Sequence, residues 1–246
     1  MARKNNHIRL YVDHPLRAAQ RVSLTRDQAH YLFGVMRLGL GDAVALFNGR
    51  DGEWHAQVSE AGKKGGVLTC ADQTRPQTAP PDLWLVCAPI RRERLSFLVE
   101  KAVELGAARI VLMQTEFTQD AKRVRVDKLQ ATAVEAAEQC EALVVPEVTE
   151  VTKFKPLMDG WDPTRQIMFC DEAAAGAATS LPDTPPPNTT HPWAVFIGPE
   201  GGFSDTERAR LREVATPVSL GPRILRAETA AIAALTLWQS RLGDWT

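Results

Sequence analysis

Hydrophobic and polar residues change their spacing near residue 80 of the chain. In the first 72 residues, short apolar runs such as "IRLYV", "AVALFNG", "EWHAQVSE" and "GGVLTC" alternate with the turn sequences "NGRDGE" and "GKKGG". This spacing is typical of short strands joined by tight turns. Residues 25–38 differ, because they place Leu32, Phe33 and Met36 on one helical face behind Thr25 as N-cap. We therefore predict a β-rich domain with one helix.

A proline-rich stretch follows. Residues 73–82, "QTRPQTAPPD", have the composition of a linker. Downstream, nearly continuous apolar runs alternate with segments of helical periodicity, which predicts a mostly parallel sheet with helices on both faces. The predicted strands are 83–90, 109–114, 166–172, 193–197 and 216–221; the predicted helices are 91–107, 126–140, 227–244 and one that begins at Ser204, with Glu207 completing a capping box. We place a first domain at residues 1–73, a linker at 74–81 and a second domain at 82–246.

Composition excludes several classes of protein. No apolar run approaches the roughly 20 residues that span a bilayer, and the start of the chain lacks the apolar segment of a signal peptide. We therefore expect a cytoplasmic protein with no membrane partner. The four cysteines form no CxxC pair, and the histidines have no metal-ligand spacing. We expect buried thiols and no metal site.

Charge is distributed unevenly although the formal net charge is only -1. Residues 1–75 contain 11 Lys/Arg and 7 Asp/Glu, a balance of +4, and the remainder contains 18 and 23, a balance of -5. A basic region on an acidic body suggests that the first domain contacts a polyanion. A solvated surface with a chance excess of basic residues is the alternative.

The stretch "FIGPEGGFSDTE", residues 196–207, is rich in glycine directly after an apolar strand that ends at Ile197. Ligands bind beyond the carboxyl ends of strands in open α/β sheets, and glycine lets the backbone approach them. No lysine follows these glycines as in a P-loop, and their spacing does not fit GxGxxG. Glu200 has no apparent packing role. We interpret the stretch as a ligand loop, with a tight turn as the alternative.

A second corner of the same kind occurs in "LGPRILRAETAAIAAL", residues 220–235. A strand end, Gly-Pro and a polar turn lead into the final helix, whose unpaired amides favour negative charge. We predict that the two corners line one pocket. Its apolar walls would be Leu220, Ile224 and Leu225, while Thr229 and Ala230 open the helix. Arg226 and Glu228 flank the start of this helix, and the alternative interpretation is that they form only a local ion pair.

The two corners together, "IGPEGGFSDTE" and "LGPRILRAETAA", closely resemble the signature of RsmE-type 16S rRNA uracil-N3 methyltransferases of the SPOUT class. The resemblance extends over nearly the whole chain: "RRERLSFLVEKAVELGA" and "AAEQC…VPEV" are similar to segments of that family's catalytic domain, and "HYLFGVMRLGLGDAVALFNG" is similar to its PUA-like barrel.

The resemblance implies an α/β fold with a SPOUT-type, mostly parallel sheet, a C-terminal trefoil knot and a small N-terminal PUA-like β-barrel. It implies S-adenosyl-L-methionine as cofactor, a homodimer, and 16S rRNA in the small ribosomal subunit as partner. By motif match the cofactor-binding residues are Leu112, Gln114, Ile197, Gly198, Glu200, Gly201, Leu220, Gly221, Ile224, Leu225, Thr229 and Ala230. Uracil N3 must lose a proton, so a base and a positive group are expected; Glu200 and Arg226 are the candidate catalytic residues.

N3 lies on the Watson–Crick edge, so the target base must be unpaired or extruded. The basic residues of the first domain would bind the RNA backbone; we name Arg3, Lys4, Arg9, Arg37, Lys63 and Lys64, and favour Arg9 among them. One departure from the family concerns Glu141 and Ala142, which stand where many members have Gly-Arg. Alternative functions are a SPOUT methyltransferase acting on ribose or tRNA, and a non-catalytic RNA-binding protein of ribosome assembly.

Overall fold

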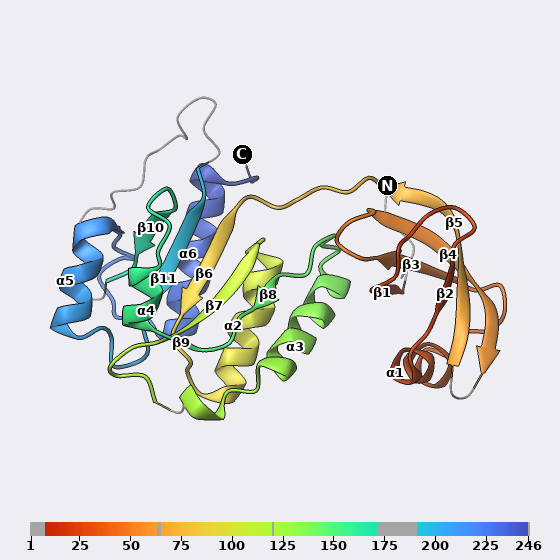
Figure 1. The fold of residues 1–246 in the computed structure, drawn as a ribbon, viewed down its shortest axis with the longest axis horizontal. Coiled ribbons are helices and arrows are strands. Elements are labelled where there is room, and N and C mark those ends of the chain that lie inside the picture. The colour runs from red at the N-terminus through yellow and green to blue at the C-terminus, as the bar shows by residue number, and fades with distance from the viewer. Residues whose placement is uncertain (1–7, 63–64, 120, 172–190, 246) are drawn as a thin grey trace. The chain divides into compact units, whose positions relative to one another are not determined.

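The computed structural model describes residues 8–62, 65–119, 121–171 and 191–245. The chain divides into two compact units (Figure 1). Unit 1 comprises Met1–Ala79 together with Ala137–Val144, and unit 2 comprises Pro80–Ala136 together with Val145–Thr246. The sequence interpretation assigned residues 137–144 to the second domain, whereas in the structure they pack with the first.

Unit 1 contains a five-stranded sheet in the order β1-β3-β4-β5-β2. β1 pairs in parallel with β3, and the other neighbours pair antiparallel. The strands are β1 Arg9–Tyr11, β2 Arg21–Ser23, β3 Ala43–Phe47, β4 Glu53–Gly62 and β5 Gly65–Arg75. This arrangement confirms the predicted β-rich character of the region, and β5 continues past the predicted domain end at residue 73.

The helix predicted at residues 25–38 forms in two parts. Thr25 caps α1 (Arg26–Ala29) in a capping box with Gln28, as its sequence position indicates. The chain then widens into the π-helix η1 (His30–Val35). Arg37 follows with φ 58°, the left-handed conformation that stops the helix.

Unit 2 contains a sheet in the order β12-β10-β11-β6-β7-β8, and β9 pairs separately with β7. Every pairing is parallel, which confirms the prediction from strand–helix alternation. The strands are β6 Leu83–Cys87, β7 Arg109–Gln114, β8 Glu147–Val148, β9 Thr152–Lys153, β10 Gln166–Phe169, β11 Trp193–Ile197 and β12 Thr216–Pro217. The predicted strand at 216–221 is therefore only two residues long.

The helices of unit 2 follow the predicted periodicity. In α2 the apolar positions at i, i+3, i+4, i+7 and i+8 are all buried, and Gly106, with φ 76°, ends the helix. Ser204 and Glu207 form the expected capping box of α5. The helices are α2 Arg92–Glu104, α3 Val126–Gln139, α4 Phe154–Asp159, α5 Asp205–Val214 and α6 Ala227–Leu242, with a short 3-10 turn η2 at Ala121–Arg123.

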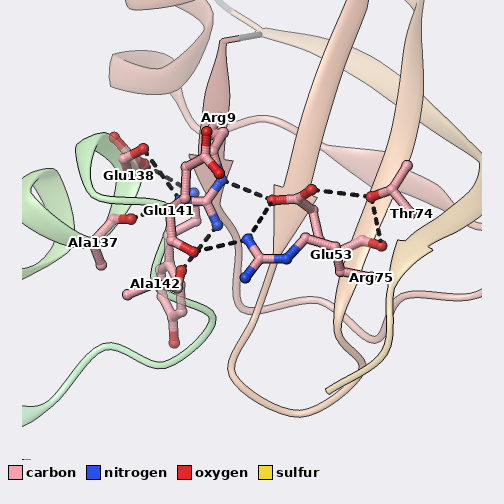
Figure 2. A network of polar contacts seen from close by, with 9 residues as sticks. Arg9, Glu53, Thr74, Arg75, Ala137, Glu138, Glu141 and Ala142 are labelled. Carbon is pink, nitrogen blue, oxygen red and sulfur yellow. Dashed lines mark hydrogen bonds and ion pairs between the residues drawn. The ribbon is translucent and has the colours of Figure 1, made fainter. Parts of the chain in front are cut away.

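Arg9 explains why residues 137–144 belong to unit 1 (Figure 2). Its Nη1 donates to the carbonyl oxygens of Ala137 at 2.6 Å and Glu138 at 3.2 Å, and its Nη2 donates to that of Ala142 at 2.9 Å. Its Nε donates to Glu53 Oε2 at 2.8 Å. These carbonyls lie at and just beyond the C-terminal end of α3, where a helix dipole favours positive charge. Arg9 thereby fixes this segment to the sheet.

The departure from the family pattern has a backbone explanation. Glu141 has φ 61°, a left-handed conformation that glycine adopts without steric cost, so the glycine expected from the family resemblance would suit this position. Its carbonyl accepts a hydrogen bond from Arg75 Nη1 at 2.9 Å. Ala142 takes part in the Arg9 network through its backbone carbonyl, so this contact needs no particular side chain.

Candidate active site

The two glycine-containing corners meet around one cavity of about 460 Å³ in unit 2. The first corner lies beyond the carboxyl end of β11 and contributes Gly198 and Glu200. The second leads from β12 to α6 and contributes Leu220 and Leu225. Each corner follows a strand of the same parallel sheet, which is why both reach the same edge.

Backbone conformation shows why these corners contain glycine. A Cβ on Gly198 would lie 2.9 Å from the Phe203 ring, and one on Gly201 would lie 3.0 Å from Phe117 Cβ. Gly202 and Gly221 have φ 69° and 101°, which side-chain-bearing residues rarely adopt. The loops are therefore built by close backbone approach, leaving the cavity between them open.

The structure brings most of the predicted cofactor residues to this cavity. Ile197, Gly198, Glu200, Gly201, Leu220, Gly221, Ile224, Leu225 and Ala230 all line it. Leu112 is fully buried within β7, and Gln114 lines a different cavity beside Lys153 and Thr206. Thr229 is exposed on the first turn of α6. These last three residues are not among those that line the cavity.

One segment of the cavity wall, at the end of β10, was missed from the sequence. Cys170 and Asp171 directly follow β10, which pairs in parallel with β11, so their position at a neighbouring strand end was the available signal. Burial raises the pKa of Cys170 to about 12. The carboxylate of Asp171 is buried and forms ion pairs with Arg208 and Arg212 of α5. Asp171 therefore ties α5 to the floor of the cavity.

The alternative interpretation of Arg226 and Glu228 as an ion pair is wrong for the part of the chain that the structure describes. Arg226 is exposed at the N-cap of α6 and lines the cavity. Glu228 instead faces α2, where its Oε1 lies 3.6 Å from Arg94 Nε. Arg94 Nη1 also lies 3.9 Å from Glu200 Oε1. Arg94 was not a candidate from the sequence, because only the packing of α2 against α6 reveals its neighbours.

The residues predicted to bind RNA differ in their accessibility. Arg37 is exposed. The side chain of Arg9 is 5% exposed, and its guanidinium carries the hydrogen bonds described above and lies 4.3 Å from the Phe47 ring centroid. Arg9 thus has a structural role, and direct contact with RNA stays a prediction without support from this geometry. Arg3, Lys4, Lys63 and Lys64 lie outside the described residues.

Two further expectations concern metals and membranes. Across the residues that the structure describes, no group of three or more His, Cys, Asp or Glu side chains is arranged to hold a metal ion. Over those same residues, none of the helices combines the length and the apolar character that crossing a bilayer requires.

Comparisons with known proteins identify the family. The model for the RNA methyltransferase domain matches residues 77–239, and that for the RNA methyltransferase PUA domain matches residues 24–69. Ribosomal RNA small subunit methyltransferase E of Rickettsia conorii is 30% identical over 92% of this chain and 93% of its own length. A putative methyltransferase from Legionella pneumophila, solved in complex with its bound cofactor SAM, is 28% identical with a TM-score of 0.85, covering 98% of this chain and 100% of that one.

The fold is shared more widely. Ribosomal RNA small subunit methyltransferase E from Neisseria gonorrhoeae is 24% identical and has a TM-score of 0.84, with 98% of this chain and 100% of that one covered. The matched RNA methyltransferase domain spans well over half of the present sequence, and the chain therefore belongs to the RNA methyltransferase family that includes the ribosomal RNA small subunit methyltransferases E.

Proposed function

We propose that this protein methylates a uridine of small-subunit ribosomal RNA at N3, with S-adenosyl-L-methionine as methyl donor. The observation that carries the proposal is the cavity between the two glycine-containing corners. Relatives and solved neighbours named as methyltransferases, one of them with bound SAM, support it. N3 as the methylated atom and 16S rRNA as the substrate rest on the two corner motifs.

The residues around the cavity suit the proposed cofactor. Leu220, Ile224 and Leu225 offer apolar surface for its adenosine part. Among the described residues no side chain caps the start of α6, so its first amide groups are available to negative or polar groups of a ligand. When bound, the cofactor supplies an electrophilic methyl group on a sulfonium. The protein must align this group with the acceptor and exclude water.

A homodimer accounts for apolar surface that one chain leaves uncovered. Ile224, at the rim of the cavity, is 81% exposed. In α6, Ile232, Ala233 and Leu237 remain only half-buried, whereas Ala231, Ala234, Leu235 and Trp238 are buried in unit 2. Apolar side chains gathered on an uncovered surface commonly mark a contact with another chain. We therefore propose that a second copy covers this face. The trefoil knot stays a prediction from the family resemblance.

RNA binding would use phosphate contacts from unit 1, in keeping with its match to the PUA domain. Arg17, Arg26 and Arg37 are exposed there. Such contacts would weaken steeply as salt rises. The proposed substrate places the protein in the cytoplasm.

The experiment is methyl transfer from labelled S-adenosyl-L-methionine to small ribosomal subunits and, separately, to naked 16S rRNA. Mass spectrometry of nuclease digests would then map the methylated nucleotide. Label on uracil N3 is the expected result. Label on a ribose or on tRNA would replace the proposed target, and absence of cofactor binding in calorimetry would exclude the methyltransferase activity itself.

A further inference from the structure

A second cavity, of about 900 Å³, adjoins the cofactor cavity and shares Glu200 and Gly201 with it. Arg91 and Arg94, at the start of α2, form one wall. Phe117 and Gln119, in the loop after β7, form another. The two cavities therefore meet at Glu200 and Gly201, where a group bound in the second cavity would reach the methyl donor.

Arg94 lies in this cavity with hydrogen-bond donors that its protein neighbours do not use. Its side chain is 31% exposed and contacts two carboxylates, Glu228 at 3.6 Å and Glu200 at 3.9 Å. Both separations exceed hydrogen-bond length. Among the described residues no hydrogen bond to its guanidinium is found, which leaves its five donors for a ligand.

Glu228 has an unusual environment for a carboxylate. Its side chain is 12% exposed, and its Oε2 is a buried oxygen that has no hydrogen-bond partner among the described residues. Burial of an unsatisfied charged group is costly. Its nearest cation is Arg94, so its position favours a fixed orientation of that guanidinium.

Phe117 offers a flat apolar surface in the same cavity. Phe117 is 46% exposed, and its Cβ lies close to Gly201. Exposed aromatic rings beside arginines commonly receive unpaired bases by stacking. The cavity thus combines a stacking surface, a cation with free donors, and a carboxylate.

We propose that this second cavity receives the target uracil and that Arg94 and Glu200 read its imide edge. The inference rests on the proposed function and names the residues that select and activate the base. The edge of uracil presents a carbonyl, the N3 proton and a second carbonyl. Arg94 donates to one carbonyl while Glu200 accepts from N3–H, and their 3.9 Å separation suits these adjacent groups.

The proton and electron changes follow from this arrangement. The N3–H bond breaks and its proton passes to the Glu200 carboxylate. Once the protonated Glu200 has turned aside, the N3 electron pair would form the new bond to the methyl group that the bound cofactor supplies, and the sulfur–methyl electron pair would return to sulfur, which would leave as a thioether. Negative charge that develops on the uracil oxygens is stabilised by Arg94. Glu228 is a positioning residue, because it acts through Arg94.

The same pair of groups discriminates against cytosine. Cytosine has a lone pair at N3 and an amino group at C4, so its edge would set an acceptor against the Glu200 carboxylate and, with Arg94 facing C4, a donor against Arg94. Mismatched polar groups in a binding site are rejected far more strongly than small changes in apolar shape. Selection of uracil therefore follows from one donor and one acceptor.

The first test replaces Arg94 with methionine and measures single-turnover methyl transfer to small ribosomal subunits. R92M is the matched control, because Arg92 is exposed on the same helix and lines neither cavity. We expect R94M to lose about 10²- to 10³-fold in rate, with cofactor affinity in calorimetry within threefold of wild type. R94K, which keeps the charge, should recover part of the rate.

The second test uses the pH dependence of E200Q. The ionisable side chains that line the two cavities with Glu200 are Arg91, Arg94, Glu116, Cys170 and Asp171, with Arg223 and Arg226 from the second corner; Glu228 contacts Arg94. Without an internal base, the N3 proton must leave to solvent, so the E200Q rate should rise about tenfold per pH unit across the neutral range. The wild-type rate should change less steeply.

The third test is E228Q, with E93Q on the exposed side of α2 as its control. Loss of the anion beside Arg94 should lower the turnover number about tenfold, with little change in KM for the subunit, and should leave thermal stability near that of E93Q. If R94M does not fold stably enough to purify, R94K and E228Q serve as the test variants.

The inference is wrong if R94K, R94M and E228Q methylate at rates within threefold of their controls while the wild type methylates uracil. In that case the proposed function still holds. An inactive wild type would contradict both the inference and the proposed function.

Discussion

Arg9 and Arg94 both lie beside glutamates, yet their surroundings differ in a way that separates structure from function. Arg9 in unit 1 is almost fully buried, and each of its guanidinium nitrogens donates to a fixed acceptor (Figure 2). Arg94 in unit 2 is partly exposed, lies beyond hydrogen-bond length from its two carboxylates, and faces a cavity.

The difference teaches that an arginine's unused donors, rather than its charge, indicate a ligand site. A buried guanidinium whose N–H groups all donate to protein acceptors has no donor left for a ligand. Its removal leaves several acceptors without a hydrogen bond. An unsaturated guanidinium beside a cavity has donors to give, and its removal leaves fewer acceptors behind.

R9M should destabilise the protein by about 3–5 kcal/mol, because it removes the hydrogen bonds to three backbone carbonyls and leaves Glu53 Oε2 with only Arg75, at 3.8 Å, as a neighbouring cation among the described residues. Urea unfolding measures the loss in the free energy of unfolding. R21M is the control, since Arg21 forms an exposed ion pair with Glu60 that is worth only about 0–1 kcal/mol. R94M should lose less stability than R9M but more than R21M, because only the buried Glu228 carboxylate loses its neighbouring cation. A loss as large for R94M as for R9M would remove the distinction between the two arginines.

G221A should weaken cofactor binding about tenfold or more, because alanine strains the backbone at φ 101° in the wall of the cofactor cavity. Calorimetry with S-adenosyl-L-methionine measures the effect. G41A in unit 1 is the matched control: Gly41 has φ 86°, and in both cases a Cβ meets nothing within 4 Å. Equal cofactor affinity in the two variants would contradict the assignment of the cavity.

D51N should flatten the dependence of stability on acid pH. The pKa of Asp51 is lowered first by a hydrogen bond from the Leu16 amide and then by one from the Asn48 side chain. Since the folded-state pKa lies below the unfolded value of about 3.9, the stabilisation is present above about pH 4 and lost as pH falls below it.

Thermal unfolding of D51N between pH 6 and pH 3 checks this expectation. The same substitution at Asp72, which is exposed in unit 1, serves as the control. Stability curves of wild type and D51N that stay parallel over this range would show that the turn around Asn48 does not depend on the charge of Asp51.

E141G should raise stability by about 0.5 kcal/mol. Relief of the left-handed strain at φ 61° is worth roughly 1–2 kcal/mol, and the greater freedom of glycine in the unfolded chain offsets part of it. E141A removes the same side chain but keeps the Cβ, and urea unfolding of the two variants separates the effects. A gain in E141A as large as in E141G would assign the cost to the side chain.

Much of the fold was predictable because it depends on local patterns. The buried face of α2, the capping boxes at Thr25 and Ser204 and the parallel sheet all follow from spacing along the chain. The two-residue length of β12 was not predictable, since a strand ends where its neighbour stops pairing.

The candidate site was predictable only in part. Its glycine loops were recognisable in the sequence, because left-handed and closely packed backbone requires glycine at definite positions. Cys170 and Asp171 were missed, since their role depends on which strand lies beside β11. Arg9 was favoured as an RNA ligand because the sequence does not show that its guanidinium donates hydrogen bonds to carbonyl groups about 130 residues away.

Patterns among neighbouring residues were thus enough to predict the longer elements of the second domain, the two glycine-containing corners and the family, whereas the short elements β8, β9 and α4 were not predicted. Only the tertiary structure decided which charged groups meet: Arg9 with the end of α3, Arg94 with Glu200 and Glu228, Asp171 with α5. The physical reason is that electrostatic interactions act over a few ångströms of space whatever the separation along the chain. Identical side chains thus become a structural clamp in unit 1 and a proposed base-reading group in unit 2.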